Sequence, residues 1–200
     1  MGFAAALVVC YLLGSIPTAY LLVRVTKGVD IRTVGSGNVG ATNAMRAAGR
    51  AVGAVVYLAD LGKGVLAAGV VPRWLLGVPA PGVALACGVA AVLGHDFPCF
   101  LRFRGGKGVA TTMGVLLGSM PLVAGLTIGV WVAVFALCRY VSVASLAAAI
   151  VIPFSQLGLH RTHAEVVFGA VLALLVLVRH RSNLQRLLSG TEHRAGSRSS

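Results

Sequence analysis

The fold depends on how one stretch is interpreted: residues 108–138, GVATTMGVLLGSMPLVAGLTIGVWVAVFALC. Its 31 residues would make a single helix about 46 Å long at a rise of 1.5 Å per residue. A helix needs only about 20 residues to cross the hydrocarbon core of a bilayer. Ser119-Met120-Pro121 lies near the middle, and proline removes a backbone donor and disfavours helix in the residue before it. The stretch is therefore expected to form two helices, the first of which is short.

The rest of the chain is equally apolar. It has 200 residues, of which 58% are hydrophobic and only 11% are charged, whereas a soluble domain has about 25% charged residues. The composition predicts an all-α integral membrane protein with one domain, residues 1–185, and a disordered basic tail, residues 186–200. The apolar segments run over 3–25, 51–71, 82–101, 108–138, 141–158 and 164–179.

The distribution of basic residues decides between six and seven spans. With seven transmembrane helices and the N-terminus outside, fourteen of the seventeen Lys and Arg residues fall on the cytoplasmic side. Six helices would place the arginine-rich tail outside, against the positive-inside rule. The sequence therefore predicts seven spans with a cytoplasmic C-terminus. The net charge of +12 is then attributed to cytoplasmic loops, and no nucleic acid partner is expected.

The first polar interruption is a glycine-rich loop, VGSGNVGATNAMR, residues 34–46. Glycines permit positive φ and close backbone approach, and successive N–H groups in such a loop can form an anion-binding nest. Residues 41–46 favour a helix, whose N-terminus would also attract an anion. Arg46 can clamp a phosphate through two hydrogen bonds. A flexible connecting loop is the alternative interpretation.

The second interruption repeats this design. Gly105-Gly106-Lys107-Gly108 precedes the short helix that is expected to begin near Val109. The spacing is not that of a nucleotide-binding P-loop, because Leu101 stands where the first glycine of that motif belongs. The turn therefore predicts phosphate binding without nucleotide hydrolysis, and a basic turn next to the membrane is the alternative.

Two further polar groups interrupt the apolar pattern. His180 and Asn183 follow the last span at i, i+3 spacing and share a helix face, so His180 is a candidate proton carrier. Asp60 and Lys63 have the same spacing inside the second span. Ionisable residues within a membrane are costly and are functional candidates by default, although a structural ion pair is an equal possibility here.

The polar stretches, taken together, resemble the PlsY family of bacterial acyl-phosphate:glycerol-3-phosphate acyltransferases. The resemblance covers nearly the whole chain in order, through YLLGSIPTAYLL (11–22), GSGNVGATNAMR (35–46), LADLGKG (58–64), GHDFPCFLRFRGGKGVAT (94–111), RYVSVAS (139–145) and RHRSN (179–183). The second and fourth of these motifs are long and specific.

The resemblance implies an enzyme that moves an acyl group from acyl phosphate to the 1-hydroxyl of glycerol 3-phosphate, giving lysophosphatidic acid and phosphate. It also implies a monomer in the bacterial plasma membrane, with the site on the cytoplasmic face, membrane lipid as a partner, and no cofactor or metal. Catalytic roles are expected for Ser36, Arg46, Lys107 and His180. Substrate binding is expected for Asn38, Gly40, Thr42, Asn43, Gly105, Gly106, Gly108, Thr111, Ser142, Ser145 and Asn183.

Several alternatives stay open at this point. The catalytic base is either His180 or the departing phosphate, and the functional serine of RYVSVAS is either Ser142 or Ser145. A transporter for organic phosphates would use the same anion-binding features, although the chain has no trace of two comparable halves. A noncatalytic lipid-binding scaffold would need no paired phosphate pockets.

Overall fold

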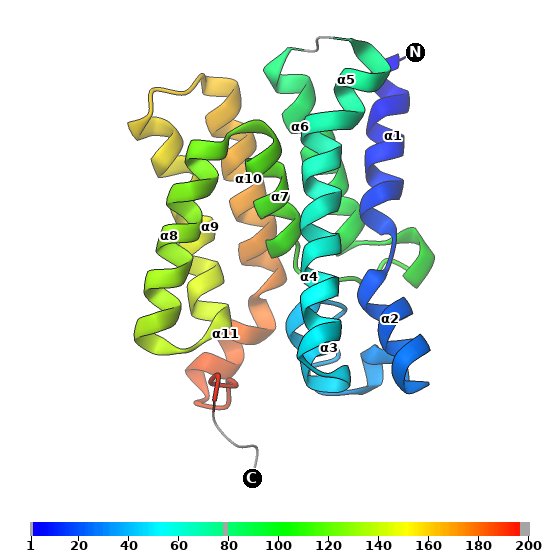
Figure 1. Cartoon of the computed structure of the whole chain (residues 1–200). Helices are drawn as coiled ribbons and strands as arrows, with labels where there is room; N and C mark the ends of the chain where they lie inside the picture. The colour runs from blue at the N-terminus through cyan, green and yellow to red at the C-terminus, as the bar shows by residue number, and fades with distance from the viewer. Residues whose placement is uncertain (1, 78–79, 197–200) are drawn as a thin grey trace. The chain divides into compact units, whose positions relative to one another are not determined.

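The computed structural model describes residues 2–77 and 80–196, and these residues form helices and the loops between them (Figure 1). The helices are α1 (Gly2–Ser15), α2 (Thr18–Lys27), α3 (Ala41–Ala48), α4 (Arg50–Val65), α5 (Val71–Leu76), α6 (Pro81–Asp96), α7 (Val109–Ser119), α8 (Pro121–Cys138), α9 (Val141–Gly158), α10 (His163–Arg179) and α11 (Arg181–Leu188). Shorter turns are η1 (Ile31–Thr33), η3 (Cys99–Leu101) and the π-helical η2 (Leu66–Val70). The predicted all-helical class is confirmed.

Length and hydropathy identify the helices that can cross a membrane. Within the described residues there are five, Gly2–Lys27, Arg50–Leu76, Gly82–Leu101, Pro121–Cys138 and Val141–Gly158. A sixth is possible if α10 and α11, which meet at a bend of 53°, form one span. The stretch 108–138 does divide as expected, because α7 ends at Ser119 and α8 begins at Pro121. At 11 residues, α7 is too short to cross a bilayer by itself.

Some helix breaks follow directly from proline. Pro17 separates α1 from α2, and Pro72 lies immediately after the π-helical turn η2 that separates α4 from α5. Proline cannot donate the backbone hydrogen bond that a continuous helix requires. The segment predicted at 3–25 therefore consists of two helices in sequence, which together form one candidate span, Gly2–Lys27.

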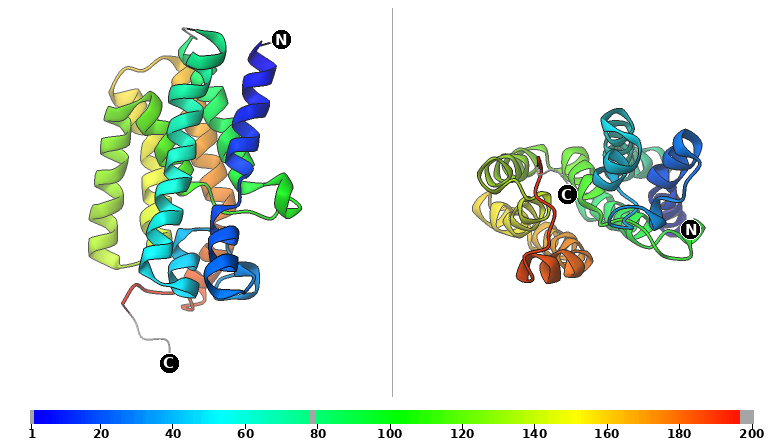
Figure 2. Two further views of the ribbon diagram at one scale, coloured as in Figure 1. Left: turned by 45° about the vertical axis from the view of Figure 1, so that its right-hand side comes forward. Right: turned by 90° about the horizontal axis from the view of Figure 1, so that it is seen from below.

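The chain divides into two compact units, Met1–Met120 and Pro121–Ser200. In the first unit α1 packs on α6 and α4 packs on α7. In the second unit α9 packs on both α8 and α10 (Figure 2). The predicted domain boundary after residue 185 falls inside α11, and residues 197–200 of the predicted tail lie outside the described part of the chain.

Glycines allow the helix backbones of the first unit to come very close together. A Cβ atom at Gly114 of α7 would lie 1.9 Å from the Leu61 carbonyl oxygen of α4, and one at Gly64 would lie 2.1 Å from that of Thr111. Gly94 of α6 makes an equally close approach to α1, at the carbonyl oxygen of Tyr11. Small residues at helix contacts are the usual means of association in lipid, where apolar side chains gain little by leaving the bilayer.

A Gly64→Ala substitution is expected to destabilise the first unit, because the new methyl group would overlap the α7 backbone. Overpacking of this kind costs about 1–3 kcal/mol. The measurement is thermal unfolding of the detergent-solubilised protein, followed by tryptophan fluorescence.

The matched control is Gly62→Ala in the same helix, since a Cβ atom at Gly62 would have no neighbour within 4 Å. Equal Tm values for the two variants would contradict the close contact between α4 and α7.

Candidate active site

The first glycine-rich loop is held in shape by one buried side chain, Asn43. Its Oδ1 atom accepts a hydrogen bond of 3.0 Å from the backbone N–H of Ser36. Its amide nitrogen lies 3.0–3.2 Å from three carbonyl oxygens of the loop, those of Ile31, Val34 and Asn38. Both ends of the amide are thus engaged within the loop, so Asn43 sets the loop conformation.

Two glycines of this loop have backbone conformations that other residues rarely adopt. Gly35 has φ 57° and Gly37 has φ 68°, both in the left-handed region. A side chain at Gly35 would also collide with Asn43, because a Cβ atom there would lie 2.4 Å from its Oδ1 atom. The loop therefore needs both Asn43 and its glycines.

The loop leads into the N-terminus of α3, as predicted. Gly40 is the N-cap residue, and its carbonyl accepts the first backbone hydrogen bonds of the helix, from Asn43 and Ala44. Thr42 lies half-buried in the first turn, while Ser36 and Arg46 are exposed. Free N–H groups and the partial positive charge at such a terminus favour an anion.

An acidic residue near this loop is neutralised by its neighbour. The Arg32 guanidinium donates to both carboxylate oxygens of Asp30, at 2.6–3.1 Å, and lies over the ring of Tyr20. The hydrogen bonds from Arg32 hold the pKa of the Asp30 carboxyl below its usual value. Asp30 is therefore paired as a carboxylate and does not offset the positive potential of the loop.

The second turn lies against the end of α6. The backbone N–H of Gly106 donates to the His95 carbonyl at 3.0 Å, and that of Gly105 donates to the Asp96 carbonyl at 3.2 Å. Gly108, with φ 69°, is the N-cap of α7. Lys107 is half-buried between these glycines. The prediction of a glycine turn that enters a helix N-terminus is confirmed here also.

Gly105 and Gly106 could not be replaced by larger residues without moving the turn. A Cβ atom on Gly105 would lie 2.1 Å from the His95 carbonyl oxygen, and one on Gly106 would lie 2.0 Å from the His95 Nε2 atom. Thr111 is buried in the first turn of α7, and its carbonyl oxygen is the atom that Gly64 of α4 approaches.

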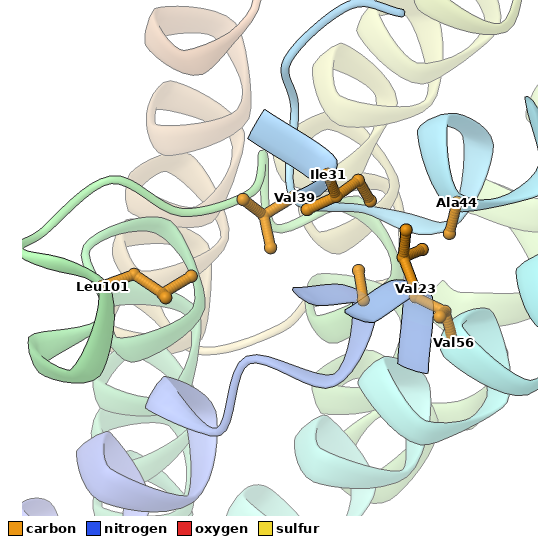
Figure 3. Close-up of a cluster of buried hydrophobic side chains, with 7 residues drawn as sticks. Val23, Ile31, Val39, Ala44, Val56 and Leu101 are labelled. Atoms are coloured by element: carbon orange, nitrogen blue, oxygen red, sulfur yellow. The ribbon is translucent and has the colours of Figure 1, made fainter. Parts of the chain in front are cut away.

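The structure brings the two glycine-rich segments together within the first unit. Val39 of the first loop and Leu101, which precedes the second turn, belong to one buried cluster with Val23, Ile31 and Val56 (Figure 3). A small cavity is lined by residues of both segments, Val39 and Gly105. Two turns that each present a helix N-terminus are thus neighbours, although about 60 residues separate them in sequence.

The remaining predicted residues belong to the second unit. His180 is buried where α10 meets α11, and its Nδ1 atom lies 2.8 Å from the Val176 carbonyl oxygen. A neutral ring in this position carries its proton on Nδ1, which makes Nε2 the acceptor nitrogen. Asn183 is buried one turn later, on α11.

The two serines of RYVSVAS have different surroundings. Ser145 donates to the Val141 carbonyl at 2.8 Å and accepts from the Trp131 indole at 3.2 Å. The buried hydroxyl of Ser142 instead makes no hydrogen bond within the described residues, but it lies near Glu192, whose pKa it helps Asn183 to lower. Ser142 is therefore the serine that shares a neighbour with Asn183.

That neighbour, Glu192, was not among the predicted site residues. It accepts from Asn183 at 2.6 Å and from the Arg186 guanidinium at 2.7 Å, which folds the chain after α11 back onto that helix. No local signal identifies such a carboxylate in the sequence, because it follows a Gly-Thr turn outside every helix. Its pairing depends on the turn at residues 189–191.

The fold and the site define a class: an all-helical membrane protein in which glycine-rich turns precede helix N-termini. Residues 4–190 match the sequence profile of the family described as glycerol-3-phosphate acyltransferase. The enzyme named glycerol-3-phosphate acyltransferase 2 of Moorella thermoacetica is 48% identical over 196 residues, covering 97% of this chain and 98% of that protein. The glycerol-3-phosphate acyltransferase of Thermosynechococcus vestitus is 46% identical, covering 94% of this chain and 92% of that protein.

Two crystal structures are also similar. Both are of PlsY, an integral membrane glycerol 3-phosphate acyltransferase. The glycerol 3-phosphate form has a TM-score of 0.91 and 40% identity, and the lysophosphatidic acid form has a TM-score of 0.88 and 39% identity. Each comparison covers 98% of this chain and 96% of the other. This chain belongs to the glycerol-3-phosphate acyltransferase family.

An Asn43→Asp substitution is expected to release the first loop, because a carboxylate cannot donate to the three carbonyl groups that the amide faces. An unsatisfied buried polar group costs about 1–3 kcal/mol. Hydrogen exchange of residues 31–40 measures the effect and should become faster. Asn38→Asp, on the same loop, is the control, and equal exchange rates in the two variants would contradict the role given to Asn43.

The contact made by Glu192 is expected to depend on pH. Burial raises the pKa of its carboxyl, but hydrogen bonds from Asn183 and Arg186, together with the nearby Ser142 hydroxyl, outweigh this effect and hold the pKa below the ordinary value of 4.5. A lowered folded-state pKa contributes stability above the unfolded-state value, and that stability is lost as the pH falls through the folded-state pKa.

The Tm difference between the wild type and Glu192→Gln should accordingly be largest near neutral pH and should shrink below pH 4.5. A difference that is constant from pH 7 to pH 3.5 would contradict the pairing of the carboxylate.

Proposed function

We propose that this protein transfers an acyl group from acyl phosphate to the 1-hydroxyl of glycerol 3-phosphate, releasing lysophosphatidic acid and phosphate. The observation that carries the proposal is that, in a member of this family, two glycine-rich segments each lead into a helix N-terminus and each contribute one residue, Val39 or Gly105, to the same cavity. The reaction brings together two phosphate-bearing substrates, and each turn offers backbone N–H groups, a helix N-terminus and a cation.

In this proposal Arg46 and Lys107 bind the two phosphate groups. Arg46 offers two parallel donors to one phosphate, while Lys107 stabilises the charge that develops on the leaving phosphate. Ser36, Asn38 and Thr42 add hydrogen bonds from the first loop. Thr111 lies in the first turn of α7, the helix that follows the second glycine turn. Gly40 and Gly108 begin the two helices whose N-termini face the phosphates, Gly105 and Gly106 allow the second turn to lie close against the end of α6, and Asn43 maintains the first loop through the hydrogen bonds described above.

The chemical step needs no covalent enzyme intermediate, because acyl phosphate is already an activated anhydride. The glycerol hydroxyl oxygen attacks the carbonyl carbon, the bond from that carbon to the phosphate oxygen breaks, and phosphate leaves. The hydroxyl proton passes to Nε2 of His180 or to the departing phosphate. Asn183 and a serine, Ser142 or Ser145, orient the glycerol.

The membrane arrangement proposed with this activity has seven spans, with α7 as the short one and the C-terminus in the cytoplasm. A short span is tolerated where protein surrounds it, and α7 is largely buried. The exposed Phe100 and Phe103 alternate with arginines in the segment that projects after α6 (Figure 2). Such a segment suits the interface between bilayer and cytoplasm. The protein would act as a monomer in the bacterial plasma membrane without a cofactor.

The direct test is to add glycerol 3-phosphate and palmitoyl phosphate to the purified protein and to measure phosphate and lysophosphatidic acid together. Equal amounts of both products are expected. Phosphate without the lipid would mean hydrolysis and a wrong acceptor. Neither product, from protein that binds glycerol 3-phosphate, would favour transport, which flux into proteoliposomes would then detect.

Lys107→Ala and Arg46→Ala are each expected to lower kcat/KM by at least about 100-fold, the usual loss when a donor to developing charge is removed. Arg104→Ala and Arg50→Ala are matched controls, because both remove exposed cations near the same two turns. Activity close to that of the wild type in both site variants would overturn their assigned roles.

His180→Gln separates the two possible bases. If His180 takes the proton, turnover should fall by about 100-fold or more, the contribution typical of general base catalysis, and the pH dependence of kcat should change shape. Retained turnover with an unchanged pH profile would assign the proton to the departing phosphate.

A further inference from the structure

A buried group of charged residues lies directly behind the second glycine turn. On α4 the Lys63 ammonium is 2.7 Å from Asp60 Oδ1, and both side chains are almost completely buried. On α6 the His95 Nδ1 atom is 3.7 Å from the same carboxylate oxygen. Lys63 also donates to the Ile16 carbonyl at 2.6 Å, at the break between α1 and α2.

Such a group is expensive in a membrane protein. Burying two charges costs several kcal/mol that their attraction does not always recover, and intramembrane ionisable residues usually serve a function. The proposed acyl transfer assigns no chemistry to Asp60, Lys63 or His95. The helices could be held together by apolar contacts alone, as α8 and α9 largely are.

The imidazole of His95 is in direct contact with the glycine turn. Its Nε2 atom lies where a side chain on Gly106 would begin, 2.0 Å from the position of a Cβ atom. The carbonyl of the same residue accepts the backbone hydrogen bond of Gly106. His95 thus contacts the turn through both its ring and its backbone, one residue before Lys107.

The small cavity that Val39 and Gly105 line is also in contact with this charged group. Asp60 and His95 are part of its lining, together with Val39 and Gly105. Ser15 also lines it, with a buried hydroxyl that makes no hydrogen bond within the described residues. Asp60 and His95 therefore line a cavity that is formed mainly by residues 14–19 at the α1–α2 break and to which each glycine-rich segment contributes one residue.

We propose that Asp60 and His95 are positioning residues for the Gly105–Lys107 turn. Asp60 holds Nδ1 of the imidazole, and the ring supports the Gly106 backbone so that the turn presents the Lys107 ammonium and the N-terminus of α7 to a phosphate. Lys63 neutralises Asp60 and ties it to the α1–α2 break. This inference rests on the proposed acyl transfer. A shift of about 1 Å in such a turn lowers activity about 100-fold.

The test must separate positioning from stability. Removing one member of a buried pair destabilises the fold because it leaves the other charge unpaired, whereas replacing both by apolar residues is often neutral. The informative variant is therefore Asp60→Leu with Lys63→Met, compared with the single change His95→Ala. Both variants should have a Tm close to that of the wild type. If the Tm is lower, activity is measured at a temperature well below the Tm of the variant.

The expected result is a rise in KM for a phosphate substrate and a fall in kcat/KM of about 10-fold or more in both variants. The stability control is Thr162→Ala, which removes the hydrogen bond that caps α10 in the second unit. It should lower Tm, since a side-chain cap stabilises the start of a helix, and leave KM unchanged. Wild-type KM and kcat in the paired variant would overturn the positioning role.

A double-mutant cycle tests whether the His95 ring and Gly106 act through the same contact. If the ring acts through Gly106, the losses in kcat/KM caused by His95→Ala and Gly106→Ala should be non-additive, because each disturbs the same contact. Additive losses would count against the inference.

Calorimetric binding of inorganic phosphate and of glycerol 3-phosphate keeps this test independent of the reaction. If the wild type binds phosphate but makes no lipid, the acyl transfer fails, and weaker phosphate binding in the paired variant still supports positioning. Unchanged binding in that variant would reject positioning, whichever reaction the protein catalyses.

Discussion

The close backbone contact between α4 and α7 is the constraint on which the first unit depends. Gly64 and Gly114 allow the two helices to approach until a methyl group on either would overlap the other backbone. Asp60 lies one turn before Gly64 in α4. Lys107 lies two residues before the start of α7. Glycine packing therefore places a buried carboxylate and a glycine-rich turn on neighbouring segments.

Irregular backbone in a membrane protein must find its hydrogen bonds inside the protein. The two glycine-rich segments meet this requirement differently. The first uses a side chain, since Asn43 contacts four backbone groups of the loop. The second uses the end of a helix, because the last carbonyl groups of α6 accept from Gly105 and Gly106. In both segments the following helix begins after a glycine, Gly40 or Gly108, whose carbonyl oxygen accepts a backbone hydrogen bond from that helix.

The sequence was sufficient where the signal is local. Pro121 predicts the division of the longest apolar run, and glycine followed by helix-forming residues predicts the starts of α3 and α7. It was insufficient where a role depends on which atoms a side chain meets. The side chain of Asn43 could bind a substrate, yet its amide forms hydrogen bonds within its own loop. Glu192 is recognised only in the structure, where the turn after α11 brings it to Asn183.

The placement of the carboxylates determines where the net charge of +12 is balanced. Only five residues are acidic, and four of them have a cation as a partner nearby in sequence: Asp30 with Arg32, Asp60 with Lys63, Glu165 with Arg161, and Glu192 with Arg186. The fifth, Asp96, is buried at the end of α6, and its carboxylate lies beside Gly108 of the second glycine turn. Four of the five carboxylates are thus paired within their own segment of the chain, and the fifth adds its charge where α6 meets the second turn.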